Sequence, residues 1–129
     1  MESNTVLMKR FYVAVLFLVS IPIHIFAQGD WNPVNPANSP DARYGHSMAT
    51  LPDGTILLFG GEDAGGELLN DLSIFNETDW NPASPANSPD ARQGHTMVTL
   101  PDGQVMLFGG ENTEGDLFND LFGFSKCFF

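Results

Sequence analysis

The chain has 129 residues, with 16 acidic residues against five lysines and arginines and a formal net charge of −11. This length allows one small domain. A surface so acidic repels phosphate backbones and anionic lipid headgroups, so we expect no nucleic-acid partner and no binding to a membrane surface. The single cysteine, Cys127, excludes an internal disulfide and a cysteine-ligated zinc site.

The first 27 residues predict a secretory signal peptide. Lys9 and Arg10 form a short basic region, and the almost unbroken apolar run 11–26 follows it. Ala27 is a small residue suited to cleavage, so we expect residues 28–129 to be secreted to an extracellular or periplasmic space, with no membrane association after cleavage. The alternative is an uncleaved N-terminal segment that anchors the chain in a membrane.

The rest of the chain consists of two copies of one unit, offset by 49 residues without an insertion. Of the 45 positions in 31–75, 30 are identical to their equivalents in 80–124. Units this similar share one structure. A repeat of about 50 residues, rich in short apolar runs and turn signals, indicates a blade of a β-propeller.

Four strands are predicted in the first unit, in chain order at 45–51, 55–59, 71–75 and 79–81. The tight turn Pro52-Asp53-Gly54 joins the first two. The second strand is apolar on both faces, as expected for a strand covered from both sides. Gly60-Gly61 ends it, and the acidic loop 62–69 leads to the third strand. The segment 82–90 is read as a link to the next blade, because proline cannot continue a central strand.

The first unit carries, in order, Arg-x-Gly-His, an apolar strand, Phe-Gly-Gly, a loop, Asn-Asp-Leu, a hydrophobic strand and then Trp. This order resembles the kelch repeat. The second unit repeats this order, but Phe129 stands where the Trp is expected. The resemblance covers about residues 30–124. We assign blade-building roles to the shared residues Arg43, Gly45, His46, Gly60, Gly61, Asn70, Asp71, Trp80, Arg92, Gly94, His95, Gly109, Gly110, Asn119 and Asp120.

The resemblance implies an all-β fold: two kelch-type four-stranded blades of an incomplete β-propeller, preceded by the hydrophobic signal helix. Within the kelch repeat region 28–129, the first blade is expected at about 43–82 and the second at about 92–129. Residues 30–34 are expected to be a displaced fourth strand of the kind that closes a ring.

Two blades cannot close a ring of about four to eight, and fewer than three repeats rarely suffice for stability. We therefore expect either a fragment of a longer propeller or a subunit that completes the ring as a homo-oligomer.

The histidines and arginines of the repeat are interpreted as structural. His46 and His95 are expected to be hydrogen-bonded blade residues rather than metal ligands, because buried polar groups need partners. The arginines are expected to pair with carboxylates such as Asp71 and Asp120, since guanidinium groups bind carboxylates in a bidentate way, or to cap backbone carbonyls. The alternative is that Arg43 and Arg92 line a mouth of the propeller and bind an anionic ligand.

Two further features each have a structural and a functional interpretation. The acidic loops, 62–67 and 111–116, are read as solvated, since their spacing matches no calcium-binding pattern. Trp31 and Trp80 are read as packing residues, with sugar stacking as the alternative.

The sequence contains no arrangement of residues that indicates catalysis, so we expect no enzymatic activity, cofactor or metal. The resemblance implies scaffolding and recognition. Together with the signal peptide, it predicts an exported kelch module or fragment that binds an unknown protein or glycan through its loops. Two alternatives remain open. The chain is the non-catalytic propeller portion of a larger secreted enzyme, such as a carbohydrate oxidase, or it is a truncated gene product without function.

Overall fold

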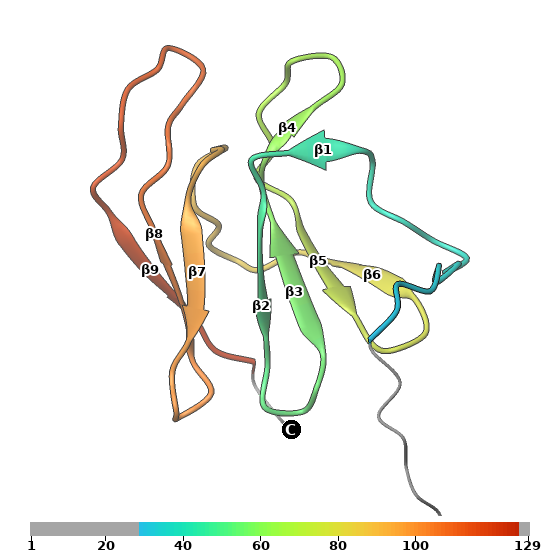
Figure 1. The fold of residues 1–129 in the computed structure, drawn as a ribbon. Helices are drawn as coiled ribbons and strands as arrows, with labels where there is room; N and C mark the ends of the chain where they lie inside the picture. Colours follow the sequence, from blue (N-terminus) through green and yellow to red (C-terminus); the bar gives the residue numbers. More distant parts are fainter. Residues whose placement is uncertain (1–28, 127–129) are drawn as a thin grey trace, which may run out of the picture. The chain divides into compact units, whose positions relative to one another are not determined.

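A computed structural model describes residues 29–126 (Figure 1). The chain divides into two compact units, Met1–Pro33 and Val34–Phe129, and all the described strands belong to the second. The described residues are all β and turns, and they contain no helix of the length and apolarity that crossing a membrane requires. The expected signal peptide, residues 1–27, and Cys127 lie outside the described residues.

The first blade is an antiparallel sheet of four strands in the order β2-β3-β5-β6. Its strands are β2 (Ser47–Thr50), β3 (Ile56–Phe59), β5 (Leu72–Phe75) and β6 (Trp80–Ala83). Each neighbouring pair is antiparallel, so the chain runs up and down through the sheet as the repeat predicts. A two-strand ladder of β1 (Arg43–Tyr44) and β4 (Glu62–Asp63) accompanies this sheet.

The second blade is an antiparallel sheet of three strands, β7 (Thr96–Thr99), β8 (Val105–Phe108) and β9 (Leu121–Phe124). The expectation of four strands in each blade therefore holds for the first blade, while residues up to 126 form only three strands of the second. The similarity between the units ends after Phe124, where Ser125-Lys126 stands in place of Asn76-Glu77, the start of the turn before the fourth strand of the first unit.

Two segments differ from the expected strands. The fourth strand of the first blade continues through Pro82 to Ala83, so the link to the next blade begins two residues later than predicted. Proline is tolerated here because β6 lies at the edge of the sheet, where its missing N–H breaks no ladder bond. Residues 30–34 form no strand. A displaced fourth strand needs a blade to pair with, and this element stays a prediction for a closed ring.

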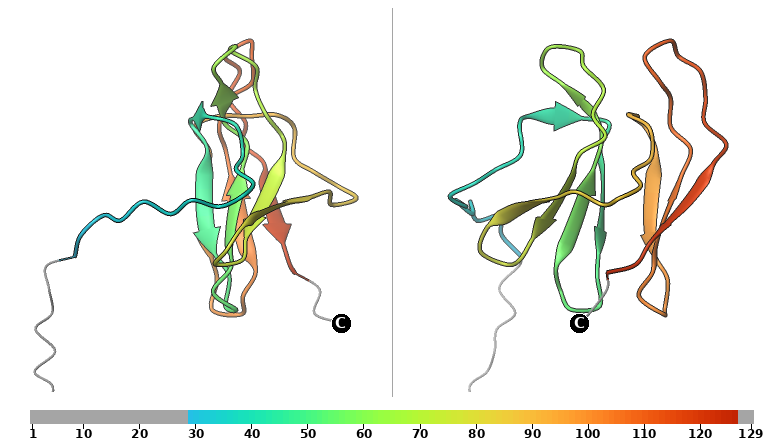
Figure 2. Two further views of the ribbon diagram at one scale, coloured as in Figure 1. Left: turned by 90° about the vertical axis from the view of Figure 1, so that its right-hand side faces the viewer. Right: turned by 180° about the vertical axis from the view of Figure 1, so that it is seen from behind.

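The core lies between the two sheets, which stand side by side with β2 next to β7 (Figures 1 and 2). Its buried apolar residues are Ala49, Leu51, Leu57, Phe59 and Leu72 from the first blade and Val105 and Leu107 from the second. In each strand these residues alternate with residues that point to the opposite face. Burial of each large apolar side chain contributes about 1.5–3 kcal/mol, so the two blades stabilise each other mainly through this contact.

Candidate functional site

Each blade contains one arginine–aspartate clamp in the same geometry. Arg43 Nη1 and Nη2 donate to the two carboxylate oxygens of Asp71 at 2.5 and 2.9 Å, and Arg92 donates likewise to Asp120 at 2.6 and 2.9 Å. The first guanidinium also donates to the carbonyl of Gly60, and the second to that of Gly109. The expected pairs are formed. Because both guanidinium groups are buried or nearly so and are occupied by these acceptors, this geometry does not favour the alternative of an anionic ligand.

The clamp in the second blade also fastens that blade to the first. The main chain of Arg92 bonds to the first blade: its N–H donates to Leu69 O at 3.2 Å, and its carbonyl accepts from Gly61 N at 2.9 Å. Its side chain stays in the second blade, with the guanidinium 4.0 Å from the ring centroid of Phe118. The hydrogen bond that the Arg92 guanidinium donates to Asp120 is the main reason why the pKa of Asp120 lies below its usual value. The residue is therefore a joint between blades.

The glycine pair after the second strand is needed for this close approach. A side chain at Gly60 would place its Cβ 2.7 Å from the carbonyl oxygen of Arg92, and one at Gly61 would lie 2.6 Å from that of Tyr44. Both glycines have positive φ, at 62° and 96°. The expectation that no side chain fits there agrees with these contacts.

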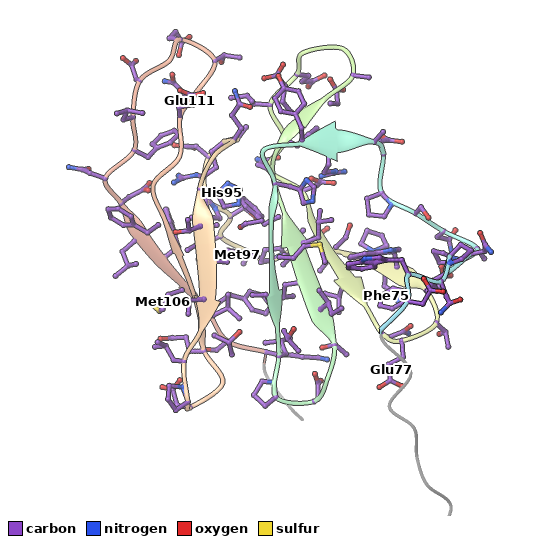
Figure 3. The ribbon with its side chains drawn as sticks, in the orientation of Figure 1. Phe75, Glu77, His95, Met97, Met106 and Glu111 are labelled. Carbon is purple, nitrogen blue, oxygen red and sulfur yellow. The ribbon has the colours of Figure 1, made fainter. Side chains whose placement is uncertain are left out.

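The two equivalent histidines have different surroundings. His46 is exposed, whereas His95 is buried between the blades, edge-on to the Phe59 ring with centroids 5.5 Å apart (Figure 3). The expectation of a hydrogen-bonded histidine is wrong for His95, since neither ring nitrogen has a partner of ordinary geometry within residues 29–126. Apolar packing at the blade interface holds the ring instead.

That burial changes the acidity of His95. Desolvation lowers its pKa to about 4, with a smaller contribution from the positive charge of Arg92. The Phe59 backbone offsets a part of this shift, although no hydrogen bond of ordinary geometry is formed with it. His95 is therefore neutral at physiological pH and serves as a packing residue.

The two tryptophans also differ. Trp80 is half-buried in β6, with its ring 5.2 Å from that of Phe75, so it packs within the blade as expected. Trp31 lies in the compact unit Met1–Pro33, where residues 29–33 form no strand, and the packing role expected for it stays a prediction.

The acidic loops are closed by their own side chains. Asp63 Oδ1 accepts the N–H groups of Gly65 and Glu67 at 2.8 and 2.9 Å, and Asn112 Oδ1, at the equivalent position, accepts those of Glu114 and Asp116. A neutral amide closes the second loop in the same way, so the loop needs no negative charge at this position. Within residues 29–126 no three potential metal ligands gather at one point.

We define the loop end of the molecule as residues 62–69 and 111–118 together with Tyr44 and Gln93. Figures 1 and 2 show the loops after β4 and after β8 projecting from the same end of the two blades. Between them lies a hollow of about 280 Å³ whose lining includes Glu62, Leu68, Gln93 and Glu111. By contrast, the cavity enclosed between the sheets holds only about 70 Å³, well below the size of common ligand sites.

The loop end carries one donor–carboxylate pair from each repeat. The Glu62 carboxylate, as acceptor for the Tyr44 hydroxyl, raises the pKa of Tyr44 above its usual value. At the equivalent positions of the second unit, Gln93 Nε2 donates to Glu111 Oε1 at 3.1 Å, and Figure 3 shows Glu111 at this end. The two pairs form a polar row that sequence reasoning missed. A usable signal existed: Tyr44 and Gln93 differ inside an Arg-x-Gly-His motif that is otherwise identical.

Repeated antiparallel blades that stack through apolar faces and are joined by a backbone-anchored clamp define a β-propeller scaffold. The family model of the KLHDC2/KLHL20/DRC7 Kelch-repeats domain matches residues 23–126, and the chain therefore belongs to the kelch-repeat family. Among solved structures it is similar to that of YjhT, with a TM-score of 0.58 and 16% sequence identity over 71% of this chain. The match spans 30% of the YjhT chain. No curated protein sequence matches at a significant level.

Proposed function

We propose that this chain is an exported, non-catalytic module that binds a protein partner through its loop end. Kelch-repeat domains typically serve as binding scaffolds. The observation that carries the proposal is the polar row at the loop end. There Tyr44 of the first unit is replaced by Gln93 in the second, while the surrounding motif is the same in both units. On a repeat scaffold, binding specificity usually resides in such variable positions.

The charge of the loop end favours a basic partner. Its two loops hold six carboxylates and no lysine or arginine: Glu62, Asp63, Glu67, Glu111, Glu114 and Asp116. Exposed Leu117 and Tyr44 add apolar area beside these charges. A lysine- or arginine-rich protein segment with a few apolar residues has the complementary chemistry. Closure of each loop by its own aspartate or asparagine reduces the entropy lost on binding.

The proposal is tested by binding to arrayed peptides of graded charge and, on a parallel array, to glycans. The full chain is compared with the loop variant Glu111→Lys/Glu114→Lys and with the control Asp90→Lys, an exposed residue of the link between blades. We expect binding to basic peptides that the loop variant loses and the control retains, and that weakens as salt is raised. Equal binding by all three proteins, or binding to glycans alone, would contradict the proposal.

A further inference from the structure

The face of the second blade that points away from the first is apolar and exposed. Phe108 is 52% exposed, whereas its equivalent Phe59 is 3% exposed under the second blade. Leu121 is 62% exposed, whereas its equivalent Leu72 is 6% exposed. We call this surface, together with Val98 and Met106, the open face, and Figure 3 shows Met106 on it, away from the first blade. The repeat thus presents one apolar face twice and covers it once.

The open face includes a groove, and the equivalent place on the first blade is filled by the second blade. The groove holds about 460 Å³ and is lined in part by Gln93, Gly94, Phe108, Gly110 and Leu117. The same place on the first blade is filled by Arg92–His95 of the second. There, Gly61 N donates to Arg92 O at 2.9 Å, Gly94 N donates to Gly45 O at 2.8 Å, and His95 packs on Phe59.

We call the segment Arg92–His95, which fills this place, the plug. The chain carries a second segment of the same sequence pattern. Residues 43–46 have the same Arg-x-Gly-His sequence as 92–95, with Arg43 held by the same clamp. Tyr44, His46 and Met48 are exposed on the first blade, so this second segment is presented to solvent. No rearrangement of the fold is needed to offer it.

We propose that the open face binds the first blade of a second copy of this chain, reproducing between molecules the blade contact seen within one. In this contact Gly110 N donates to Arg43 O of the second copy, Gly45 N of the second copy donates to Gly94 O, and His46 of the second copy covers Phe108. Each of these contacts repeats an observed one, shifted by the 49-residue period. An interface of this kind uses two different surfaces, so it propagates head to tail and closes when a ring is complete. Two, three or four copies would give a ring within the range of about four to eight blades.

One position distinguishes the two contacts. Within the molecule, Lys126 Nζ of the second blade donates to Asp53 Oδ2 of the first at 2.8 Å. The period places Glu77 of the second copy opposite Asp102, so a like-charge pair replaces the ion pair. The contact between molecules is therefore weaker than the contact within one, and Glu77→Lys should strengthen it, most of all at low salt.

The test is the mass of the purified full chain, measured by sedimentation velocity and native mass spectrometry over a range of concentrations. We expect an oligomer of two to four copies that dissociates on dilution. Phe108→Asp and Leu121→Asp, at exposed positions, should leave a folded monomer by circular dichroism, while Thr113→Asp, an exposed change on the same blade, should assemble as the parent does. Glu77→Lys should lower the dissociation constant several-fold.

The outcomes separate cleanly. A parent chain that is a monomer at every concentration overturns the proposal, as does an oligomer that both open-face variants leave unchanged. A chain whose open face is covered instead by another protein, recovered as a one-to-one complex that Phe108→Asp abolishes, also overturns it. Phe108 and Leu121 lie outside the loop end, so peptide binding by the monomeric variants tests the proposed function separately from assembly.

Discussion

The buried histidine gives the most incisive test of the blade interface. His95→Phe keeps a ring in contact with Phe59 but removes both unpaired ring nitrogens and the group that can be protonated. We expect this variant to be less sensitive to acid than the parent chain. His46→Phe, at the equivalent exposed position, is the matched control. At concentrations where the chain is a monomer, the ring at this position stays in contact with solvent after folding.

The magnitude follows from the linkage between protonation and folding. The pKa of His95 falls from 6.5 to about 4 on folding, so between these values the unfolded chain binds a proton that the folded chain does not. Stability therefore decreases as pH falls through this window and is fully retained above it. At pH 5 the linked loss is about 2 kcal/mol, a large part of the stability of a small domain.

The assay is equilibrium unfolding in urea at pH 7 and at pH 5, followed by the fluorescence of Trp80, which is half-buried in the first blade. The parent chain and His46→Phe should lose about 2 kcal/mol between the two pH values, and His95→Phe should lose much less. If His95→Phe shows the same loss as the parent, the acid sensitivity comes from another group and the assignment of a desolvated neutral histidine is refuted.

Three further predictions use the same unfolding assay. Asp120→Asn should cost about 2 kcal/mol and Asp71→Asn about 1, because the arginine that loses its partner is fully buried only in the second blade; equal costs would contradict this. Gly60→Ala should destabilise far more than Gly109→Ala, since only the first adds a Cβ within 2.7 Å of a carbonyl oxygen, whereas the second meets nothing closer than 3.6 Å. Asp63→Asn should be nearly neutral and Asp63→Ala should cost about 1 kcal/mol, because the loop needs an acceptor and not a charge.

Much of the blade was predictable because the chain contains its own comparison. Residues that are identical at a 49-residue spacing, such as Arg43 and Asp71, had to serve the same purpose twice, and the clamp they form was expected. The Gly60-Gly61 pair was predicted for the same reason. Strand positions followed from short apolar runs between turn residues, with errors of one or two residues at their ends.

The rest depends on neighbours, which a repeat pattern does not specify. His46 and His95 are identical in sequence context, yet only the second is buried, because only it has a blade on the other side. Pro82 joins a strand because that strand is at an edge. The row at the loop end arises from Tyr44 and Gln93, two positions that differ and therefore fall outside the repeated motif.

These differences between equivalent residues show which contributions to the free energy of folding arise within a blade and which arise between blades. The hydrogen bonds between each arginine and its aspartate, and the loop closures, are made inside each blade and are the same in both. The apolar faces and the histidines are satisfied only between blades, so their burial rises with the number of blade contacts. Since hydrophobic burial is the main favourable contribution to folding, a pair of blades gains it across one contact, whereas each blade in a closed ring gains it on both sides. The stability of this chain should therefore increase with its concentration, as expected when assembly covers the open face.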